Sequence, residues 1–152
     1  MIDRKLGRFL QQGLSIHVGT RDESLNPTGA RAAAAIVEPG GQHLVVYVAE
    51  AAAARLLENL RSNGQIAIGF GRPEDERACQ VKGMVLDIRE AEASERATVE
   101  GQWQGLMEQF ARIGIPPAVA AGWTYWPAQA IRVKVTAVFE QTPGPQAGTP
   151  LA

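Results

Sequence analysis

Six segments of the chain have the hydrophobic pattern of β-strands. Residues His43–Ala49 (HLVVYVA) are apolar on both faces, which predicts a strand that is covered on both sides. Residues 14–21, 65–70 and 128–140 alternate between apolar and polar or small positions, and 78–88 do so with a polar end. These segments therefore predict strands with one buried face.

The sixth strand is predicted from its surroundings rather than from its own composition. Residues 30–38 (ARAAAAIVE) contain an alanine run that helix propensity alone would favour as a helix. The turn sequence Pro39-Gly40-Gly41 follows directly, and the strand at 43–49 comes next. We interpret the two segments as a β-hairpin.

Two longer segments have helical spacing instead. Apolar residues recur three and four positions apart in 50–63 and in 94–113. Gly64 follows the first segment and suits a helix end, while Ser94 is the expected N-cap of the second. With most strands joined by hairpins, the pattern predicts a mainly β protein, an antiparallel barrel with peripheral helices.

The remaining parts of the chain are short. A small helix is expected at 3–12, with Asp3 as its N-cap. Residues 1–141 are expected to form a single domain. Residues 142–152 are rich in proline and glycine, so we expect a flexible C-terminal tail.

Composition excludes several classes of function. The chain of 152 residues has a net charge of −1 and 20% charged residues, so no basic field indicates nucleic acid or an acidic membrane. One cysteine, Cys79, and two histidines, His17 and His43, do not make a metal site by themselves. No segment reads as a signal peptide or as a membrane span, so we expect a cytoplasmic protein.

One strand suggests a cleft. Gln80 and Lys82 lie on one face of 78–88, and Gly83 at the changeover is expected to host a bulge. The same face is expected to continue with three apolar residues, Met84, Leu86 and Ile88. On the preceding strand, the small residues Ala67 and Gly69 would let a flat group approach. The simpler alternative for Gln80 and Lys82 is a strand end that faces solvent.

Aromatic residues and a histidine add weaker candidates. Trp123, Tyr125 and Trp126 form a tight group, which is either a hydrophobic plug or an apolar wall for a flat ligand. Ser15 and His17 share a strand face, but no strained elbow surrounds them, so a hydrolase is not indicated. We interpret His17 as a structural or partly exposed histidine.

The order of these elements resembles a known family. The run VVYVAEAAAARLLENLRSNGQIAIGF, the following QVKG strand and the ending VTAVFEQTPGPQAG resemble the pyridoxamine 5′-phosphate oxidase-like FMN-binding split barrels. The resemblance extends from about residue 14 to residue 148. It implies a six-stranded antiparallel split β-barrel, a homodimer with FMN in a groove between subunits, and flavin-dependent oxidoreductase chemistry on an unknown substrate.

The resemblance also implies residues that hold the phosphate of FMN. Arg31 matches a basic residue on the second barrel strand, and Arg55 matches the arginine of a serine, arginine and lysine cluster. Ala54 and Leu56 stand where the serine and the lysine are usual, which removes a hydroxyl and a cation from the site. Taken without the resemblance, Arg31 is a solvated strand residue, and Arg55 pairs with a polar neighbour on its own helix.

Other implied contacts concern the flavin ring. Gln80 falls on the strand that supplies an amide to the ring, and Lys82 shares its face. Ala49 and Glu50 lie where main-chain groups meet the isoalloxazine, and Trp126 would close the groove from the partner subunit. No catalytic acid or base is implied, because the flavin itself performs the hydride chemistry. The alternative function is a non-enzymatic split-barrel carrier or sensor of a small molecule, with weak or no flavin binding.

Overall fold

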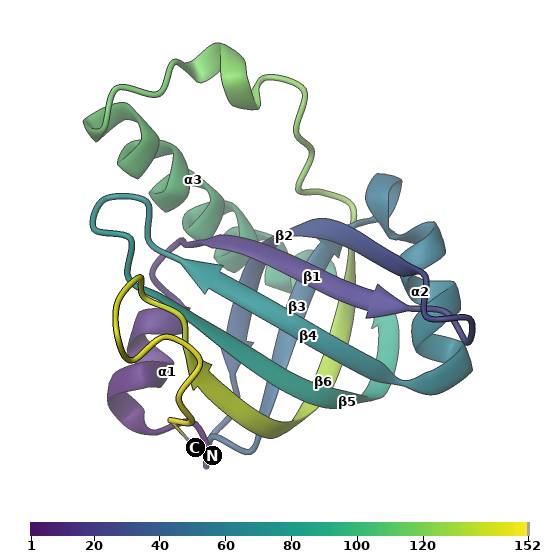
Figure 1. Cartoon of the computed structure of the whole chain (residues 1–152). Coiled ribbons are helices and arrows are strands. Elements are labelled where there is room, and N and C mark those ends of the chain that lie inside the picture. The colour runs from purple at the N-terminus through teal and green to yellow at the C-terminus, as the bar shows by residue number, and fades with distance from the viewer. Residues whose placement is uncertain (152) are drawn as a thin grey trace.

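The protein is a closed barrel of six antiparallel strands with helices around it, as Figure 1 shows. The computed structural model describes residues 1–151. The strands are β1 (Ser15–Arg21), β2 (Pro27–Val37), β3 (His43–Ala49), β4 (Gln65–Gly71), β5 (Ala78–Glu90) and β6 (Ala128–Glu140). They neighbour one another in the order β1-β2-β3-β6-β5-β4. The prediction of a mainly β, six-stranded antiparallel barrel is therefore confirmed.

Three helices and two short 3-10 turns complete the fold. They are α1 (Arg4–Leu10), α2 (Glu50–Asn63), η1 (Ala93–Glu95), α3 (Arg96–Arg112) and η2 (Pro117–Ala120). Asp3 caps α1 as predicted, since its carboxylate accepts a 2.7 Å hydrogen bond from the Leu6 amide. Gly64 ends α2 in the left-handed conformation, also as predicted. No helix within residues 1–151 is both long enough and apolar enough to cross a bilayer.

The alanine run forms a strand because both of its sides are covered. β2 and β3 pair as the predicted hairpin, with a register shift between Ala32 and Ala34. Ala32 and Ala35 face the barrel interior, whereas Ala33 and Ala34 both face outward into a second apolar cluster. This two-sided burial, together with pairing to β1 and β3, outweighs the helix propensity of alanine.

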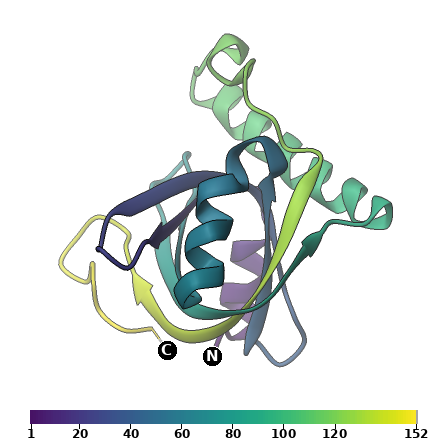
Figure 2. The same ribbon diagram turned by 90° about the vertical axis from the view of Figure 1, so that its right-hand side faces the viewer.

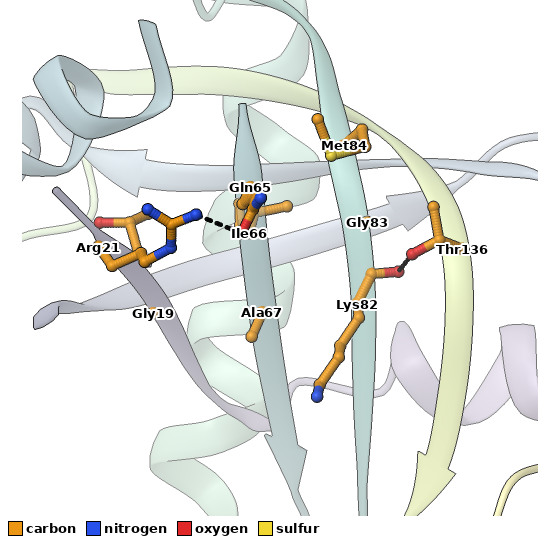
Figure 3. A pocket seen from close by; sticks show the side chains of 10 residues that line it. Gly19, Arg21, Gln65, Ile66, Ala67, Lys82, Gly83, Met84 and Thr136 are labelled. Carbon is orange, nitrogen blue, oxygen red and sulfur yellow. Dashed lines mark hydrogen bonds between the residues drawn. The ribbon is translucent and has the colours of Figure 1, made fainter. Parts of the chain in front are cut away.

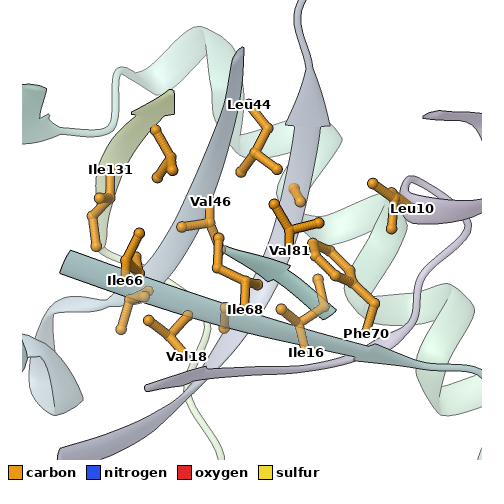
Figure 4. Close-up of a cluster of buried hydrophobic side chains, with 14 of the residues drawn as sticks. Leu10, Ile16, Val18, Leu44, Val46, Ile66, Ile68, Phe70, Val81 and Ile131 are labelled. Atoms are coloured by element: carbon orange, nitrogen blue, oxygen red, sulfur yellow. The ribbon is translucent and has the colours of Figure 1, made fainter. Parts of the chain in front are cut away.

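The barrel interior is the main core of the protein. Alternate residues of all six strands point inward, as Figure 4 shows for Ile16, Val46, Ile68 and Val81 among others. Helix α2 lies across one end of the barrel (Figure 2), and its Leu56 is fully buried in the same cluster. The apolar stripe of α2 therefore closes the barrel.

A second core lies outside the barrel, beneath α3. It contains Ala34, Tyr47 and Trp103, with Trp123 and Trp126 packed at its edge. The buried side chain of Gln102 anchors α3, because it accepts from the Ala35 amide at 3.0 Å and donates to the Ala35 carbonyl at 2.8 Å. This packing covers the outer face of β2 and β3, whereas Figure 1 shows no helix across the outer faces of β1, β4 and β5.

The pairing of β5 with β6 contains two irregularities, and the second changes which side chains of β5 face outward. The first shift falls between Lys82 and Gly83, where a bulge was predicted, but its extra residue is Thr136 of β6 and not Gly83. A second shift, between Val85 and Asp87, was not predicted. Because of it, Ile88 packs against the barrel core and does not share a face with Met84 and Leu86. The expected continuation of that face to Ile88 was therefore wrong.

The start of α3 differs from what the sequence predicted, and the C-terminal tail adds a contact with β6. The second long helix is not capped by Ser94, because α3 begins at Arg96 after the turn η1, where Glu92 and Glu95 form a reciprocal capping box. The C-terminal tail curls back toward β6, where the Leu151 amide donates to the Val138 carbonyl at 2.8 Å. The flexibility of residues 142–152 stays a prediction.

Candidate functional site

Strand pairing places two of the predicted site residues on one row of the uncovered outer face. Arg31 on β2 pairs with His17 on β1, His17 pairs with Gly69 on β4, and Gly69 pairs with Gln80 on β5. Three strand spacings separate Arg31 from Gln80, which is about 14 Å along the row. The row therefore runs from a guanidinium to an amide across His17 and a glycine.

The adjacent row consists mostly of small residues. Gly29 pairs with Gly19, Gly19 with Ala67, and Ala67 with Lys82. Together with Gly69, these small residues leave a flat stretch of sheet, which we call the floor. The floor consists of Gly19, Gly29, Ala67 and Gly69. A floor with no side chain larger than a methyl group lets a planar group lie close to the backbone.

A groove of about 450 Å³ lies over one end of the floor. Figure 3 shows Arg21, Gln65 and Met84 at one side of it and Lys82 at the other. Arg21 donates a 3.1 Å hydrogen bond to the Gln65 side chain. The groove therefore combines a small apolar base with cationic and amide groups at its rim, which is the usual make-up of a small-molecule site.

Arg31 stands where the open floor meets the part of the sheet that is covered by α3. Its ζ carbon lies 3.9 Å from the ring centroid of Trp123, and a terminal nitrogen donates a 3.2 Å hydrogen bond to Ser15 Oγ. Partial burial lowers the pKa of the Arg31 guanidinium. Arg31 is therefore a half-buried, oriented cation rather than a solvated strand residue.

His17 is the neighbour of Arg31 on the row. The protein around its imidazole removes part of the water and lowers the pKa of His17, and the positive charge of Arg31 lowers it further. The residue is nevertheless exposed on the outer face. His17 therefore favours its neutral form and can both donate and accept a hydrogen bond above the floor.

Gln80 and Lys82 lie on the outer face, as the alternation along β5 predicts. Lys82 is exposed, and its Nζ lies 5.2 Å from the ring centroid of Phe139. The carbonyl of Lys82 accepts a 3.1 Å hydrogen bond from Thr136 Oγ1. Gly83, the next residue, has no space for a side chain, because an added Cβ would lie 2.4 Å from Val133 and 2.5 Å from the Lys134 carbonyl. This close approach of β5 and β6 fixes where Lys82 emerges from the sheet.

The junction between β3 and α2 lies near Arg31 because β2 and β3 are paired strands. Ala32 pairs with Val48, so Arg31 and Ala49 are the next residues along neighbouring strands. Ala49 is buried and pairs with Ala128. The Glu50 amide already donates to the Pro127 carbonyl at 2.9 Å. Of the two main-chain positions predicted to meet a flavin, the Glu50 amide is thus already bonded within the chain.

The predicted phosphate cluster on α2 is not assembled as the resemblance implies. Leu56, at the position of the usual lysine, is fully buried in the barrel core and cannot present a group to a ligand at the surface. Arg55 is exposed, and the pKa of Asp22 is lowered mainly by the hydrogen bonds from Asn26 and to a smaller extent by the charge of Arg55. The groove beside the floor includes neither Arg55 nor Arg31. Within one chain, Arg55 and Lys82 therefore do not line the same groove.

Trp126 belongs to the aromatic group at the edge of the second core, beneath α3. It is partly buried, and the Arg96 guanidinium lies 5.7 Å from its ring centroid. Trp123, by contrast, contacts Arg31 directly. The aromatics were predicted as a group, without a separate role for Trp123. Nothing in the local pattern could have indicated that role, because the contact joins a strand to a distant loop.

The site contains no built metal centre within residues 1–151, since no group of three metal-binding side chains comes together there. Arg21, which lines the groove, was also missed. Its signal was present, because strand alternation places Arg21 on the same face as His17 and Gly19.

Comparison with known proteins supports the fold. The sequence matches no protein-family model, and none of the curated proteins matches it. Among solved structures it is similar to HupZ from Group A Streptococcus, with 18% identity, a TM-score of 0.59 and coverage of 97% of this chain and 100% of the other. A proposed pyridoxamine 5′-phosphate oxidase from Lactobacillus delbrueckii has 14% identity and a TM-score of 0.55, with 90% and 92% covered.

A third structure is an FMN-binding protein from Syntrophomonas wolfei, with 11% identity, a TM-score of 0.54 and coverage of 99% and 88%. Identities this low establish the fold. The chain therefore has the split-barrel fold of the pyridoxamine 5′-phosphate oxidase-like proteins, and the resemblance found in its sequence is confirmed at that level.

Proposed function

We propose that the protein binds FMN on the floor of its outer face and acts as a flavin-dependent oxidoreductase in the cytoplasm. The observation that supports this most is the row from Arg31 to Gln80, with a flat stretch of glycine and alanine beside it. A planar ring fits against such a floor, and a phosphate fits the oriented guanidinium at its edge.

The residues present suit the parts of this cofactor. Arg31 has in-plane donors for a phosphate, and Gln80 and Lys82 offer donors at the opposite edge of the ring. His17 lies between them, and partial burial and, to a smaller extent, the charge of Arg31 favour its neutral form by lowering its pKa. When bound, FMN would supply the hydride chemistry, and these residues would bind and orient it.

The same face is proposed to be covered by a second copy of the chain. Next to the groove, Met84 is 40% exposed and Leu86 is 48% exposed on β5. Large apolar side chains beside a flat, uncovered sheet favour burial against another protein surface. A homodimer would place a wall over the floor and would give Trp126 or Arg55 of the partner a route to the ligand.

A second candidate is a non-enzymatic carrier or sensor of a flat or anionic small molecule. It is favoured by the burial of Leu56 and by Ala54, because Arg55 has neither a lysine nor a hydroxyl beside it. Such a protein would use Arg31 for an anionic group but would bind FMN weakly.

Equilibrium titration with FMN and with riboflavin, followed by flavin fluorescence, tests the proposal. The wild-type protein should bind FMN more tightly than riboflavin, which lacks the phosphate. Arg31→Gln should weaken FMN binding about tenfold and leave riboflavin binding unchanged, since it removes one charge-assisted contact. Arg55→Gln is the companion variant for the other predicted phosphate contact.

The outcomes separate the two candidates. A wild-type protein that binds neither flavin would contradict the proposal and leave the carrier or sensor. Bound FMN that is reduced by a nicotinamide nucleotide would support the oxidoreductase. Light scattering on the same samples should give the mass of two chains.

A further inference from the structure

Arg31 is held from two sides although it has no acidic partner. Trp123 lies against one side of its guanidinium, at 3.9 Å, and Ser15 Oγ accepts a hydrogen bond at 3.2 Å. Within residues 1–151 it forms no ion pair with a carboxylate. A half-buried cation without a carboxylate is costly unless another group compensates it. The ring of Trp123 is that group.

This arrangement leaves most hydrogen-bond donors of Arg31 available. A guanidinium has five N–H donors, all in its plane, and the bond to Ser15 involves one terminal nitrogen. The ζ carbon of Arg31 lies over the ring of Trp123 at 3.9 Å from its centroid, so this contact is a cation–π contact and takes up no conventional hydrogen bond. The in-plane edge remains able to bind an oxyanion with two parallel hydrogen bonds.

Trp123 is itself fixed by two aromatic contacts on α3. Its ring meets that of Trp103 at 6.1 Å and 68°, and that of Phe110 at 6.1 Å and 69°. Both are edge-to-face arrangements, which aromatic pairs favour. Gln102 binds α3 to the backbone of β2, the strand that bears Arg31. A continuous chain of packed contacts therefore determines where the guanidinium lies.

We propose that Trp123 is a positioning residue that holds Arg31 ready to bind the phosphate of a ligand on the floor. The inference rests on the proposed function, in that it takes the phosphate to belong to a flat ligand. Trp123 restricts Arg31 before binding, so less side-chain freedom is lost when the anion arrives. The ring also compensates the desolvated charge without competing for its donors.

The test compares affinities for FMN and for riboflavin in two variants. Trp123→Leu removes the ring and keeps an apolar side chain, and it should weaken FMN binding about tenfold while riboflavin binding stays within twofold. Trp123→Phe retains an aromatic face and should recover most of the loss. Equal weakening of both ligands by Trp123→Leu would overturn the proposal, because Trp123 would then be a general wall of the pocket. Unchanged FMN affinity would also overturn it.

Tyr125→Leu is the matched control. Tyr125 lies in the same loop and its ring is 5.6 Å from that of Trp103, but its hydroxyl donates to Glu100 rather than touching Arg31. The Tyr125→Leu variant should loosen the loop to a similar degree as Trp123→Leu and leave the ratio of FMN to riboflavin affinity unchanged. A change in that ratio equal to the change in Trp123→Leu would assign the effect to the loop and contradict a specific role of Trp123.

A second readout does not depend on flavin binding. The Nε–H signal of Arg31, identified by its loss in Arg31→Gln, should be shifted in the wild-type NMR spectrum by the ring current of Trp123. Inorganic pyrophosphate should move this signal in the wild type. In Trp123→Leu, about tenfold more pyrophosphate should be needed to reach half of the full shift. If the wild type binds no flavin but shows this difference, the proposed function fails and the positioning role stands. Identical pyrophosphate titrations, or no response of the wild type, would overturn the positioning role.

Discussion

The Tyr47 hydroxyl donates a 2.6 Å hydrogen bond to Glu95, which joins the middle of β3 to the start of α3. The same carboxylate accepts 2.7 and 2.8 Å bonds from the two terminal nitrogens of Arg89 on β5, and a 2.7 Å bond from the Glu92 amide. Glu95 thus ties β3 and β5 to the N-terminal end of α3, the helix that packs over β2 and β3. The position of α3, and with it that of Trp123, depends on this junction.

This junction predicts a pH dependence of stability. The Arg89 bond, the Tyr47 bond and the Glu92 amide hold the pKa of Glu95 at about 2, below its ordinary value of 4.5. The stabilisation is therefore fully present above pH 4.5 and is lost as the pH falls from 4.5 toward 2. Glu95→Gln should lower the free energy of unfolding by about 1–3 kcal/mol at neutral pH.

Urea unfolding of the wild type and Glu95→Gln between pH 2 and pH 7 measures this contribution. Other carboxylates titrate in the same window, so the relevant quantity is the difference between the two proteins, which should shrink as the pH falls. Glu100→Gln breaks the exposed Arg96–Glu100 pair and should have a smaller effect. A difference that stays constant down to pH 2 would show that the stabilisation by Glu95 does not depend on its negative charge.

The close approach of β5 and β6 beside Lys82 gives a second prediction. Gly83→Ala would place a Cβ 2.4 Å from Val133 Cγ1 and 2.5 Å from the Lys134 carbonyl, so the strands would have to move apart. We expect a loss of about 1–3 kcal/mol in the free energy of unfolding. Gly71→Ala on β4 is the control, because nothing lies within 4 Å of its added Cβ. Equal stability of both variants would contradict the close approach of β5 and β6 at Gly83.

The pairing of His17 with Arg31 gives a third prediction. The pKa of His17 should lie below 6.5 in NMR titrations, and Arg31→Gln should raise it, although burial will keep part of the shift. Since the folded pKa is lowered, this histidine stabilises the fold fully above pH 6.5, and that contribution is lost as the pH falls through the folded value. A His17 pKa unaffected by Arg31→Gln would place the guanidinium elsewhere.

Strand alternation predicted much of the outer face from sequence. It placed His17 and Gly19 together on one strand and Gln80 and Lys82 together on another, and the barrel brings both pairs onto a single face. An irregular pairing at Gly83 was also predictable, since a glycine stood at the change from polar to apolar residues, although the extra residue there, Thr136, lies on β6. The prediction failed at Ile88, because a bulge without a glycine leaves no mark on the alternation.

Helix α2 shows two arguments in conflict. Spacing along the sequence assigned Leu56 to the apolar stripe of the helix, whereas the family resemblance aligned it with a lysine of a phosphate site. The structure buries Leu56 completely, so the spacing argument was the better guide at this position. The contact between Arg31 and Trp123 was beyond both arguments, because it depends on how α3 and its loop fold back over β2.

The central claim is that a planar ligand lies on the floor between Arg31 and Gln80, and Gly69→Val tests it most directly. Gly69 is between them on the row, and an added Cβ there meets only the His17 carbonyl, at 3.9 Å. The valine should therefore be tolerated by the strand and project into the space of the ligand. We predict that this variant keeps the melting temperature of the wild type and loses FMN binding in fluorescence titration, whereas FMN binding of wild-type strength by a folded Gly69→Val protein would contradict the account.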